Sequence, residues 1–581
     1  MASVATNLTE IFLRAPPSAQ RLNIDFNYLY QPQAMRVFPG SVSWLRPFPN
    51  ILALTGHLER GGFRTASILF LSIWTWALIG NCATAVAGTE GVFNVKNFGA
   101  AGDGKTLDTD AINQAILAAN ALGGGTVRFP AGTYLSASIH LKSNITLYLE
   151  PGSVIEAVSE IVTNYDPRES RNSTNYQDSG HSYWHDALIW GDKIDNISIL
   201  GPSLIHGNGL HSGLYGREYR DPPSGSGDKA ISMVNCHNVT LRDFSILHGG
   251  WFGILATGTD NLTIDNLKID TNRDGMDIDC CHNVRISNCS VNSPWDDGIC
   301  LKSSYALGFN RATENVTINN CFVTGGLIEG TLLDGTFKRS PADYAGRTGR
   351  IKLGTESKGG FKNITVANCV FNDSRGLAIE SVDGGDIEDV TISNISMRDV
   401  DNSPIFIRLG NRLRGPDHPP VGVIRRVNIS NVVVSGANHK YASIISGIPG
   451  HPIEDVRISN LHILQDGGGT AEQAKLQPPE KETGYPEPAS FGTMPAYGFF
   501  IRHAKGMEFS DATVRTAKED LRPAFVLDDV AGANFQNVRC NSNDTNAVPC
   551  SFALKNVVDF NLHQCLPLPD QQLVQVESKQ F

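Results

Sequence analysis

The stretch NLTIDNLKIDTNRDGMDIDCCHNVRISNCSVNSPWDDGICLKSS, Asn261 to Ser304, contains one short pattern twice. The two copies are NLTIDN, which begins at Asn261, and NVRISN, which begins 22 residues later at Asn283. In each copy apolar residues alternate with polar ones, and an asparagine closes the unit. Alternation with a period of two residues indicates β-strands rather than helices.

The same unit recurs five more times along the chain, at spacings of 26 to 48 residues where loops intervene. A unit this short cannot bury its apolar face alone, so it must stack on its neighbours. The sequence therefore predicts an all-β fold, a right-handed parallel β-helix in which each turn forms one rung. The exception is TDAINQAILAANALGGG at Thr109–Gly125, which predicts an N-terminal capping helix. The asparagines that close the seven units are Asn266, Asn288, Asn320, Asn368, Asn394, Asn431 and Asn460.

These asparagines are expected to form a ladder inside the helix at one bend, each amide bonding the next rung and satisfying buried backbone groups. Cysteines follow three of them directly, at Cys289, Cys321 and Cys369, which predicts a column of small core residues rather than disulfides or metal ligands. Cys540 and Cys550 frame a short polar segment and are candidates for a local disulfide in a secreted protein.

The N-terminal residues 1–87 differ from the rest. An apolar run from Ala66 to Gly80 follows Arg60 and Arg64 and precedes the small residues of NCATAVAG. That order is typical of a secretory signal, with a signal-anchor as the alternative, and the run is short for a membrane span. We expect an extension with a signal-like segment over residues 1–87 and a single β-helix domain with a C-terminal tail over 88–581. The mature protein would be extracellular or in a cell wall, without stable membrane association.

Secretion also permits glycosylation of Asn-x-Ser/Thr sequons. Those at Asn261, Asn315 and Asn363 lie at rung starts and are candidate glycan sites. Those at Asn288 and Asn394 belong to the predicted ladder, so they are expected to stay unmodified.

Three aspartates of the opening stretch lie at positions that stacking would bring together. Asp274 lies 13 residues after Asn261 and Asp296 lies 13 after Asn283, so equal offsets place them on consecutive rungs, about 4.8 Å apart. Matching the apolar alternation of DGMDID on DGICLK instead pairs Asp274 with Asp297. Under either register all three carboxylates converge on one patch of the surface.

Carboxylates that lie this close repel one another, so at least one pKa should rise. Paired carboxylates with separated pKa values are the groups that hydrolyse glycosidic bonds, one as a protonated acid and one as a base for water. A Ca²⁺ site or a solvated edge is the alternative interpretation. The net charge of -11 gives no support to a nucleic-acid partner.

Two further stretches, FNVKNFGAAGDGKTLDTDAINQAI and GGGTVRFPAGTYL, together with Asp274 and the Asp296-Asp297 pair, resemble glycoside hydrolase family 28, the polygalacturonases, in their plant-type form. The resemblance spans about Gly91 to Cys565. It implies hydrolysis of α-1,4-galacturonosidic bonds in a pectic polysaccharide or oligogalacturonide, with inversion, by a monomer that needs no cofactor or metal. Carried over, Asp296 would be the general acid, while Asp274 and Asp297 would orient and deprotonate the attacking water.

The chain departs from this family at two motifs. Gly349 stands where the histidine of Gly-His-Gly belongs, and Ala378-Ile379-Glu380 stands where Arg-Ile-Lys belongs. Either the substrate carboxylate is held elsewhere or the sugar in that subsite is not galacturonate. Since an acidic polymer needs a locally positive cleft, we expect other cations to replace them, with Glu356 and Glu380 as possible partners. The candidate substrate-binding residues are Lys302, Arg350, Lys352, Arg408 and Trp295. The histidines that could replace the missing imidazole are His185, His206 and His248.

Other functions remain open at this point. A hydrolase of another pectic linkage, such as rhamnogalacturonan, a Ca²⁺-dependent pectate lyase and a non-catalytic β-helix carbohydrate-binding protein would each share the fold. Two long polar insertions, Tyr165–Asp186 and Gln465–Tyr497, are expected to crowd the cleft. If they wall one end of it, the enzyme would attack chain ends rather than interiors.

Overall fold

The computed structural model divides the chain into two units, Met1–Ile73 and Trp74–Phe581. The predicted extension and signal-like segment at residues 1–87 lie outside the described residues, as does Cys550. No helix among the described residues is long and apolar enough to cross a membrane. The structure describes residues 91–169, 176–178, 180–212, 222–341, 343–344, 346–542 and 552–581.

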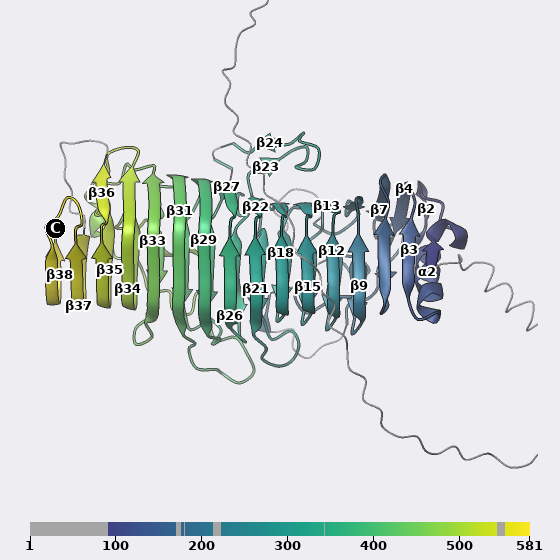
Figure 1. Cartoon of the computed structure of the whole chain (residues 1–581), viewed down its shortest axis with the longest axis horizontal. Coiled ribbons are helices and arrows are strands. Elements are labelled where there is room, and N and C mark those ends of the chain that lie inside the picture. Colours follow the sequence, from purple (N-terminus) through teal and green to yellow (C-terminus); the bar gives the residue numbers. More distant parts are fainter. Residues whose placement is uncertain are drawn as a thin grey trace, which may run out of the picture. The chain divides into compact units, whose positions relative to one another are not determined.

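The described part of the second unit is a parallel β-helix whose strands form three stacks. Figure 1 shows strands lying side by side along the axis of the β-helix. Each of the middle rungs places one strand in each stack. The first stack contains β5 (Ile139–His140), β8 (Ala187–Asp192), β11 (Lys229–Val234), β14 (Phe252–Thr257), β17 (Asp274–Asp279), β20 (Ile299–Ser303), β25 (Ile351–Ser357), β28 (Leu377–Ser381), β30 (Ile405–Leu409) and β32 (Ser443–Ser446).

The other two stacks follow the same rungs. The second stack contains β1 (Val92–Asn94), β3 (Gly125–Phe129), β6 (Ile145–Leu149), β9 (Asp195–Leu200), β12 (His237–Arg242), β15 (Asp260–Asp265), β18 (His282–Ser287), β21 (Thr313–Asn319) and β26 (Phe361–Ala367). The third stack contains β2 (Asp103–Leu107), β4 (Gly132–Ser136), β7 (Ser153–Ala157), β10 (Leu204–His206), β13 (Ser245–Leu247), β16 (Lys268–Asp270), β19 (Ser290–Asn292), β22 (Phe322–Thr324) and β27 (Val370–Ser374).

Toward the C-terminus, strands of neighbouring stacks join into longer ones. The long strands are β29 (Ile387–Val400), β31 (Ile424–Ala437), β33 (Ile453–Gln465), β34 (Phe499–Thr516), β35 (Phe525–Gln536) and β37 (Phe552–His563). The remaining elements are η1 (Val95–Phe98), α2 (Thr109–Ala121), β23 (Leu327–Ile328), β24 (Lys338–Arg339), η3 (Gln473–Lys475), η4 (Pro488–Phe491), β36 (Arg539–Ser542) and β38 (Gln571–Gln580).

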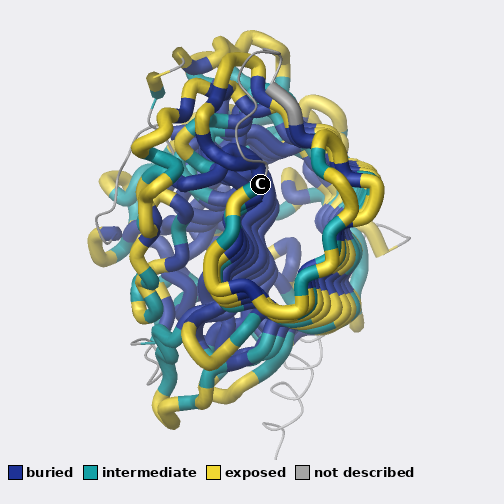
Figure 2. Tube along the Cα trace, turned by 90° about the vertical axis from the view of Figure 1, so that its left-hand side faces the viewer, coloured by how far each residue is buried: buried dark blue, intermediate teal, exposed yellow. Residues whose placement is uncertain are grey.

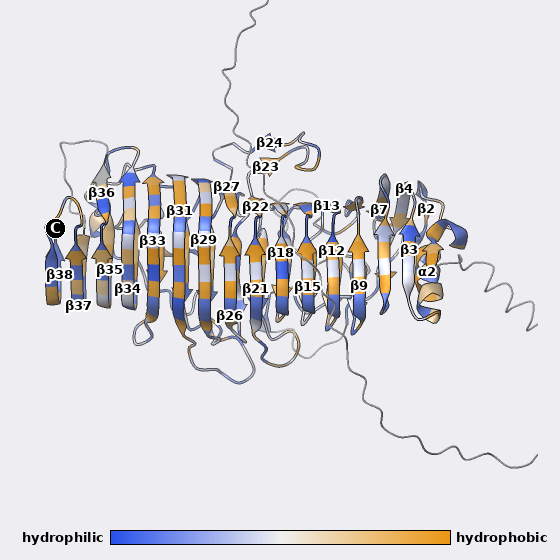
Figure 3. Cartoon of the chain, viewed as in Figure 1, coloured by the Kyte–Doolittle hydropathy of each residue, from blue (hydrophilic) through white to orange (hydrophobic). Residues whose placement is uncertain are grey.

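The period-2 alternation explains this arrangement. In the second stack Leu262 pairs with Val284, Val284 with Val316 and Val316 with Ile364, all of them buried. Each strand therefore adds one apolar side chain to the same interior column, and the intervening polar residues face outward. Hydropathy alternates in bands along the strands (Figure 3). An end-on view shows buried positions recurring at the same place in successive rungs (Figure 2).

The asparagine ladder exists, but its predicted inward orientation is wrong. Asn394 donates to Asn368 Oδ1 at 2.9 Å, Asn431 donates to Asn394 at 2.9 Å and Asn460 donates to Asn431 at 2.8 Å. All seven ladder asparagines are exposed and have φ between 49° and 58°. This left-handed conformation, which asparagine tolerates, bends the chain and turns the amide outward, while the next residue points into the core. Burial therefore gives no reason for Asn288 or Asn394 to escape glycosylation.

The structure also contains a second ladder of asparagine side chains, which the sequence did not predict. Asn238 donates to Asn196 Oδ1 at 3.0 Å, Asn261 donates to Asn238 at 3.0 Å and Asn283 donates to Asn261 at 3.3 Å. Asn363 likewise donates to Asn315 Oδ1 at 2.8 Å. These residues begin repeated units and all but the half-buried Asn315 are exposed, so in the middle rungs bonded asparagines also stand at the starts of second-stack strands.

The predicted cysteine column and capping helix are confirmed. Cys289, Cys321 and Cys369 are buried free thiols on consecutive rungs, since the residues that follow them pair in register. Cys540 is also a buried free thiol. Helix α2 begins at Thr109 as predicted and ends at Ala121, shortly before the glycine run. It contacts β1, β3 and β5 at the first rungs.

Candidate active site

The first stack brings the three aspartates together. Gly275 N–H donates to the carbonyl of Asp297 at 3.0 Å, and Met276 pairs with Ile299. This offset places Asp274, the first residue of β17, beside Asp297. The register that matches the apolar alternation is therefore the observed one, and Asp296 lies one residue earlier in the loop before β20.

The three carboxylates form a cluster in a cavity. One carboxylate oxygen from each lies within 4.8 Å of the others. Asp274 and Asp297 are buried, whereas the Asp296 side chain is 26% exposed. The cavity has a volume of about 420 Å³ and is lined by all three aspartates. The predicted convergence of these residues is confirmed.

Two members of the cluster have opposite protonation preferences. Burial, together with the charges of Asp277 and Asp296, raises the pKa of Asp274 well above its ordinary value. Burial would also raise the pKa of Asp297, but the cations of Arg350 and Lys352 outweigh it and hold that pKa below the usual range. The surroundings thus favour the protonated form of Asp274 and the ionised form of Asp297.

Asp296 has a different partner. Arg273 Nη2 donates to Asp296 Oδ2 at 2.6 Å, and the guanidinium of Arg273 lies 4.9 Å from the ring centre of Trp251. Ser293 Oγ donates to the carbonyls of Asp296, at 2.9 Å, and of Arg273, which fixes the loop. The aspartate at the cavity surface is therefore ion-paired in the free protein.

Three of the four predicted cations line the cavity: Lys302, Arg350 and Lys352. Each is buried and already paired. Lys302 Nζ lies 3.1 Å from Glu356 Oε2, Arg350 Nε bonds Asp297, and Lys352 Nζ lies 3.2 Å from Asp297 Oδ2. The predicted role of Glu356 as a partner is thus confirmed.

Glu380 stands where the family has a cation, and it faces Lys352 with 3.6 Å between Oε2 and Nζ. Burial raises the pKa of Glu380 to about 7, although Lys352 and Arg350 oppose this shift. Glu380 therefore provides only weak neutralisation for Lys352 near neutral pH.

Arg408 does not line the cavity, so the prediction that it contacts substrate there is wrong. It pairs in register with Glu380 one rung farther along the first stack and is 1% exposed. Its guanidinium donates to Ser446 Oγ at 2.8 Å, to the Gly447 carbonyl at 3.0 Å and to the Glu480 carbonyl at 2.7 Å. Arg408 holds the 465–497 insertion onto the sheet.

His181, from the first long insertion, lines the cavity, whereas none of the three predicted histidines does. Its Nε2 lies 2.8 Å from Asp277 Oδ2. Burial and Lys302 would lower the pKa of His181, but the bond to Asp277 and the charge of Glu356 outweigh them and raise it. His185 instead stacks on Trp190. Sequence reasoning missed His181 because its segment has no repeat that fixes its position.

The second insertion contributes Tyr485 and Glu487 to the cavity. Tyr485 Oη bonds Thr355 Oγ1 at 3.0 Å and Lys352 Nζ at 3.4 Å. The prediction that both insertions crowd the cleft is confirmed, because each provides lining residues.

Aromatic side chains complete the lining. Trp295 lines the cavity as predicted and packs edge-on against Tyr344, with 5.4 Å between ring centres. Trp251 and Phe252 lie nearby in the same cavity. Aromatic faces of this kind suit the apolar faces of sugar rings.

A metal ion is a second use for the same carboxylates. Among the described residues, Asp274, Asp296 and Asp297 form a group whose oxygens are close enough to bind one ion. Arg273 already pairs with Asp296, and Arg350 and Lys352 pair with Asp297. A metal would have to compete with these three cations.

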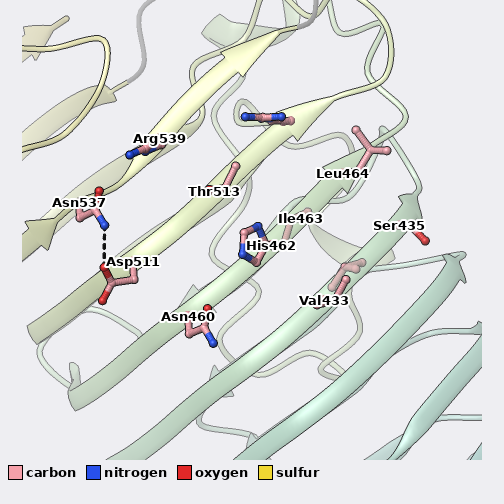
Figure 4. A pocket seen from close by; sticks show the side chains of 12 residues that line it. Val433, Ser435, Asn460, His462, Ile463, Leu464, Asp511, Thr513, Asn537 and Arg539 are labelled. Carbon is pink, nitrogen blue, oxygen red and sulfur yellow. Dashed lines mark hydrogen bonds between the residues drawn. The ribbon is translucent and has the colours of Figure 1, made fainter. Parts of the chain in front are cut away.

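A larger cavity of about 740 Å³ lies elsewhere, over β31, β33, β34 and β36 (Figure 4). Among the residues that line it, Asp511 is the one carboxylate, and it accepts a hydrogen bond from Asn537 Nδ2 at 2.7 Å. A single carboxylate bound to an amide does not provide the acid and base that hydrolysis needs.

Two family models match the chain. Residues 92–216 match the model described as "Rhamnogalacturonase A/epimerase, pectate lyase-like", and residues 201–337 match "Right handed beta helix region". A relative from Vitis vinifera named "Probable polygalacturonase" is 24% identical over 394 residues, which cover 63% of this chain and 73% of that protein. The chain is polygalacturonase-like. This finding confirms the predicted likeness to glycoside hydrolase family 28.

Further comparisons agree with this polygalacturonase-like assignment. An Arabidopsis thaliana protein named "Exopolygalacturonase clone GBGE184" is 25% identical over 354 residues, 57% of this chain and 70% of that protein. The solved exopolygalacturonase of Thermotoga maritima aligns with a TM-score of 0.52 and 16% identity, covering 84% of this chain and 95% of that one. The Yersinia enterocolitica Family 28 exopolygalacturonase aligns with a TM-score of 0.53 and 18% identity, covering 82% and 78%. These structural likenesses establish the right-handed parallel β-helix fold.

Proposed function

We propose that this polygalacturonase-like chain hydrolyses glycosidic bonds of pectic polysaccharides, and that Asp274, Asp296 and Asp297 perform the reaction. The observation that carries the proposal is the carboxylate cluster in the lined cavity, with its oxygens within 4.8 Å of one another. One member has a raised pKa and another a lowered pKa. Separated pKa values of this kind provide an acid and a base at the same pH.

Asp297 suits the role of the base. Arg350 and Lys352 keep it ionised, so it can accept a proton from water as the water attacks the anomeric carbon. Asp296 suits the role of the acid, because it is the most exposed of the three and reaches the open cavity. It would protonate the glycosidic oxygen as the bond to the anomeric carbon breaks.

Asp274 suits the role of proton store and water-orienting group. In the free protein the guanidinium of Arg273 pairs with Asp296. When substrate draws Arg273 away, the proton held by Asp274 can pass to Asp296 through one bridging water, because their carboxylate oxygens lie within 4.8 Å of one another. After bond cleavage Asp297 loses its proton to solvent and Asp274 takes one up from solvent, which restores the cluster.

The stereochemical course is a separate part of the proposal. The family resemblance implies inversion, whereas oxygens within 4.8 Å are nearer to the separation of about 5 Å in retaining enzymes than to the roughly 6.5–9.5 Å of most inverting ones. We propose inversion, with the attacking water held between Asp274 and Asp297. Proton NMR of the first product would show the inverted anomer, and a retained anomer would instead make Asp297 a nucleophile.

We further propose that the enzyme is secreted, works as a monomer on cell-wall pectin and attacks chain ends. The signal-like segment in residues 1–87 supports secretion, and the sequons support glycosylation. Attack at chain ends is supported by the two insertions that line the cavity. It is also supported by relatives named "Exopolygalacturonase clone GBGE184" and "Exo-poly-alpha-D-galacturonosidase", from Dickeya chrysanthemi.

A reducing-sugar assay on polygalacturonate and on rhamnogalacturonan fragments, with wild type beside Asp296→Asn, tests the hydrolase proposal. We expect new reducing ends with wild type and almost none with the variant. Monomer as the first product would support attack at chain ends. Products that absorb in the ultraviolet and vanish on chelation would indicate a lyase, and inactivity on every pectic substrate would favour a binding protein.

A further inference from the structure

We infer that Glu487 selects the sugar beside the acid cluster: its carboxylate occupies the place on Arg350 that a uronate carboxylate would take, so the adjoining subsite accepts an uncharged ring. The inference rests on the proposed hydrolase function and names the substrate feature that this cavity discriminates. Glu487 lies in the Gln465–Tyr497 insertion, far from the three aspartates in sequence, and lines the cavity together with them.

Three side chains from three rungs converge on the Glu487 carboxylate. Asn402 Nδ2 donates to Oε1 at 2.7 Å, Arg350 Nη1 donates to Oε2 at 3.1 Å, and Arg375 Nη1 lies 3.6 Å from Oε1. Two guanidinium groups and an amide around one carboxylate form the kind of site that recognises a carboxylate. Here the carboxylate belongs to the protein itself.

The segment that carries Glu487 is firmly held. Pro488 and Phe491 of η4 are buried, and Phe491 packs against Phe406 with 6.2 Å between ring centres and under the guanidinium of Arg408. Before Glu487, the hydroxyl of Tyr485 bonds Thr355. Because the chain is held on both sides of Glu487, this residue is a fixed part of the cavity wall rather than a group that moves in and out of the cavity.

The charges of the cavity point the same way. Five cations line it: Arg273, Lys302, Arg350, Lys352 and Arg375. Each has a carboxylate of the chain within 3.6 Å. A uronate that enters next to Glu487 would bring a second negative charge close to this carboxylate, and the nearby cations already have carboxylate partners. A ring with hydroxyl groups alone could instead donate hydrogen bonds to Glu487.

Arg273, unlike Glu487, is a group that can bind a substrate carboxylate. Its guanidinium pairs with Asp296 and is partly exposed over the Trp251 ring. Exchange of Asp296 for a substrate carboxylate would let Arg273 hold a uronate on the other side of the cluster. The cavity therefore fits a substrate in which a uronate and a neutral sugar flank the bond that is cut.

The experiment compares two oligosaccharides of equal length, one of galacturonate alone and one in which galacturonate alternates with rhamnose. The quantity measured is the ratio of kcat/KM for the alternating oligomer to that for the uniform one. We expect wild type to favour the alternating oligomer by at least about 10-fold. Glu487→Gln keeps the size of the side chain and one acceptor oxygen but removes its charge, so it should lower this ratio about 10-fold or more.

The matched control is Glu482→Gln in the same insertion. Glu482 accepts a hydrogen bond from Asn411 at 3.3 Å and does not line the cavity, so the ratio should stay within about twofold of wild type. Because a ratio cancels any loss of folded enzyme, misfolding cannot imitate the effect. Equal use of both oligomers by wild type, or an unchanged ratio in Glu487→Gln, would overturn the inference. Failure of wild type to cut either oligomer would instead overturn the proposed function.

Discussion

The first stack carries one column of side chains whose character changes along the β-helix. In the middle rungs the column contains Asp277, Cys300 and Lys352, and in the later rungs it contains Phe406, Ile444 and Phe500, all in continuous register. The middle part lies at the cavity that is lined by the three aspartates. The later part is covered by Phe491, Met494 and Ala496 of the second insertion. The same backbone stacking thus supports a polar cavity in one region and an apolar interface in the other.

The difference shows that stacking brings residues together but does not decide what they do. Charged residues in the middle rungs are held by one another, as Asp297 is by Arg350 and Lys352. The later rungs bury apolar area instead, and Arg408 there serves to bind the insertion. Replacements in the middle rungs should therefore change activity, and replacements in the later rungs should change stability.

The largest expected effect is on catalysis. Asp296→Asn should lower kcat on the pectic substrate by about 1000-fold, within the range for loss of a general acid. Asp528→Asn is the matched control from the later rungs, where Asp528 follows Arg502 in register and pairs with Lys555. It should stay within about twofold of wild type. Equal losses in both variants would erase the contrast between the two regions.

Next in size is a stability effect in the later rungs. Phe406→Ala removes a ring that is 1% exposed and should lower the free energy of unfolding by about 3 kcal/mol. Chemical denaturation followed by circular dichroism measures this change. Asp296→Asn, measured in parallel, should differ from wild type by less than about 1 kcal/mol, as expected for a partly exposed site. A smaller loss of unfolding free energy in Phe406→Ala than in Asp296→Asn would contradict the assignment of the apolar interface.

A smaller effect on the free energy of unfolding should appear at Asp274, and this effect should depend on pH. Its folded pKa is raised, so ionisation penalises the folded state above the unfolded value of about 3.9. Asp274→Asn should therefore be inactive yet more stable than wild type at pH 7, by about 1 kcal/mol or more. The gain should vanish below about pH 4, where the aspartate is protonated in both states.

Asp297→Asn is the comparison for that variant. Its folded pKa is lowered, so the aspartate stabilises the fold above its unfolded value, and the contribution disappears only as pH falls through the folded pKa. Asp297→Asn should thus be less stable than wild type at pH 7. Melting temperatures of the three proteins from pH 3.5 to 7.5 decide the matter, and shifts of the same sign in both variants would refute the assigned protonation states.

The smallest effect concerns the exposed ladder, which both regions share. Asn431→Ala removes bonds to Asn394 and Asn460 and should cost about 1 kcal/mol. Asn431→Gly loses the same bonds but tolerates the φ of 55°, so it should be less harmful than alanine. Thermal unfolding compares the two. If alanine proved the milder change, the backbone conformation would not be the reason for asparagine here.

Much of the fold was predictable because it repeats. The closing asparagines fix the strands, and the alternation of DGMDID on DGICLK fixes the register that places Asp274 beside Asp297. Alternation also placed Arg350 and Lys352 on the cavity face. The orientation of the ladder was not predictable from alternation, because the left-handed conformation of each asparagine interrupts it.

The rest of the site could not be predicted from periodicity. His181, Tyr485 and Glu487 come from insertions that have no partner in the next rung, so no register relates them to the aspartates. Arg408 was misplaced for the opposite reason. Its register is regular, but the stack continues beyond the cavity, and sequence alone does not say where the second insertion covers it.

The insertions have a consequence for how such a protein can change over generations. Asn363 follows Asn315 by 48 positions, and the segment between them includes β23 and β24, yet the strands of the second and third stacks on either side pair without a shift. A chain of this design can lengthen or exchange one loop while the rungs beneath stay as they were. New substrate preferences can thus arise from changes in the loops, while the inherited chemistry of the rungs is preserved.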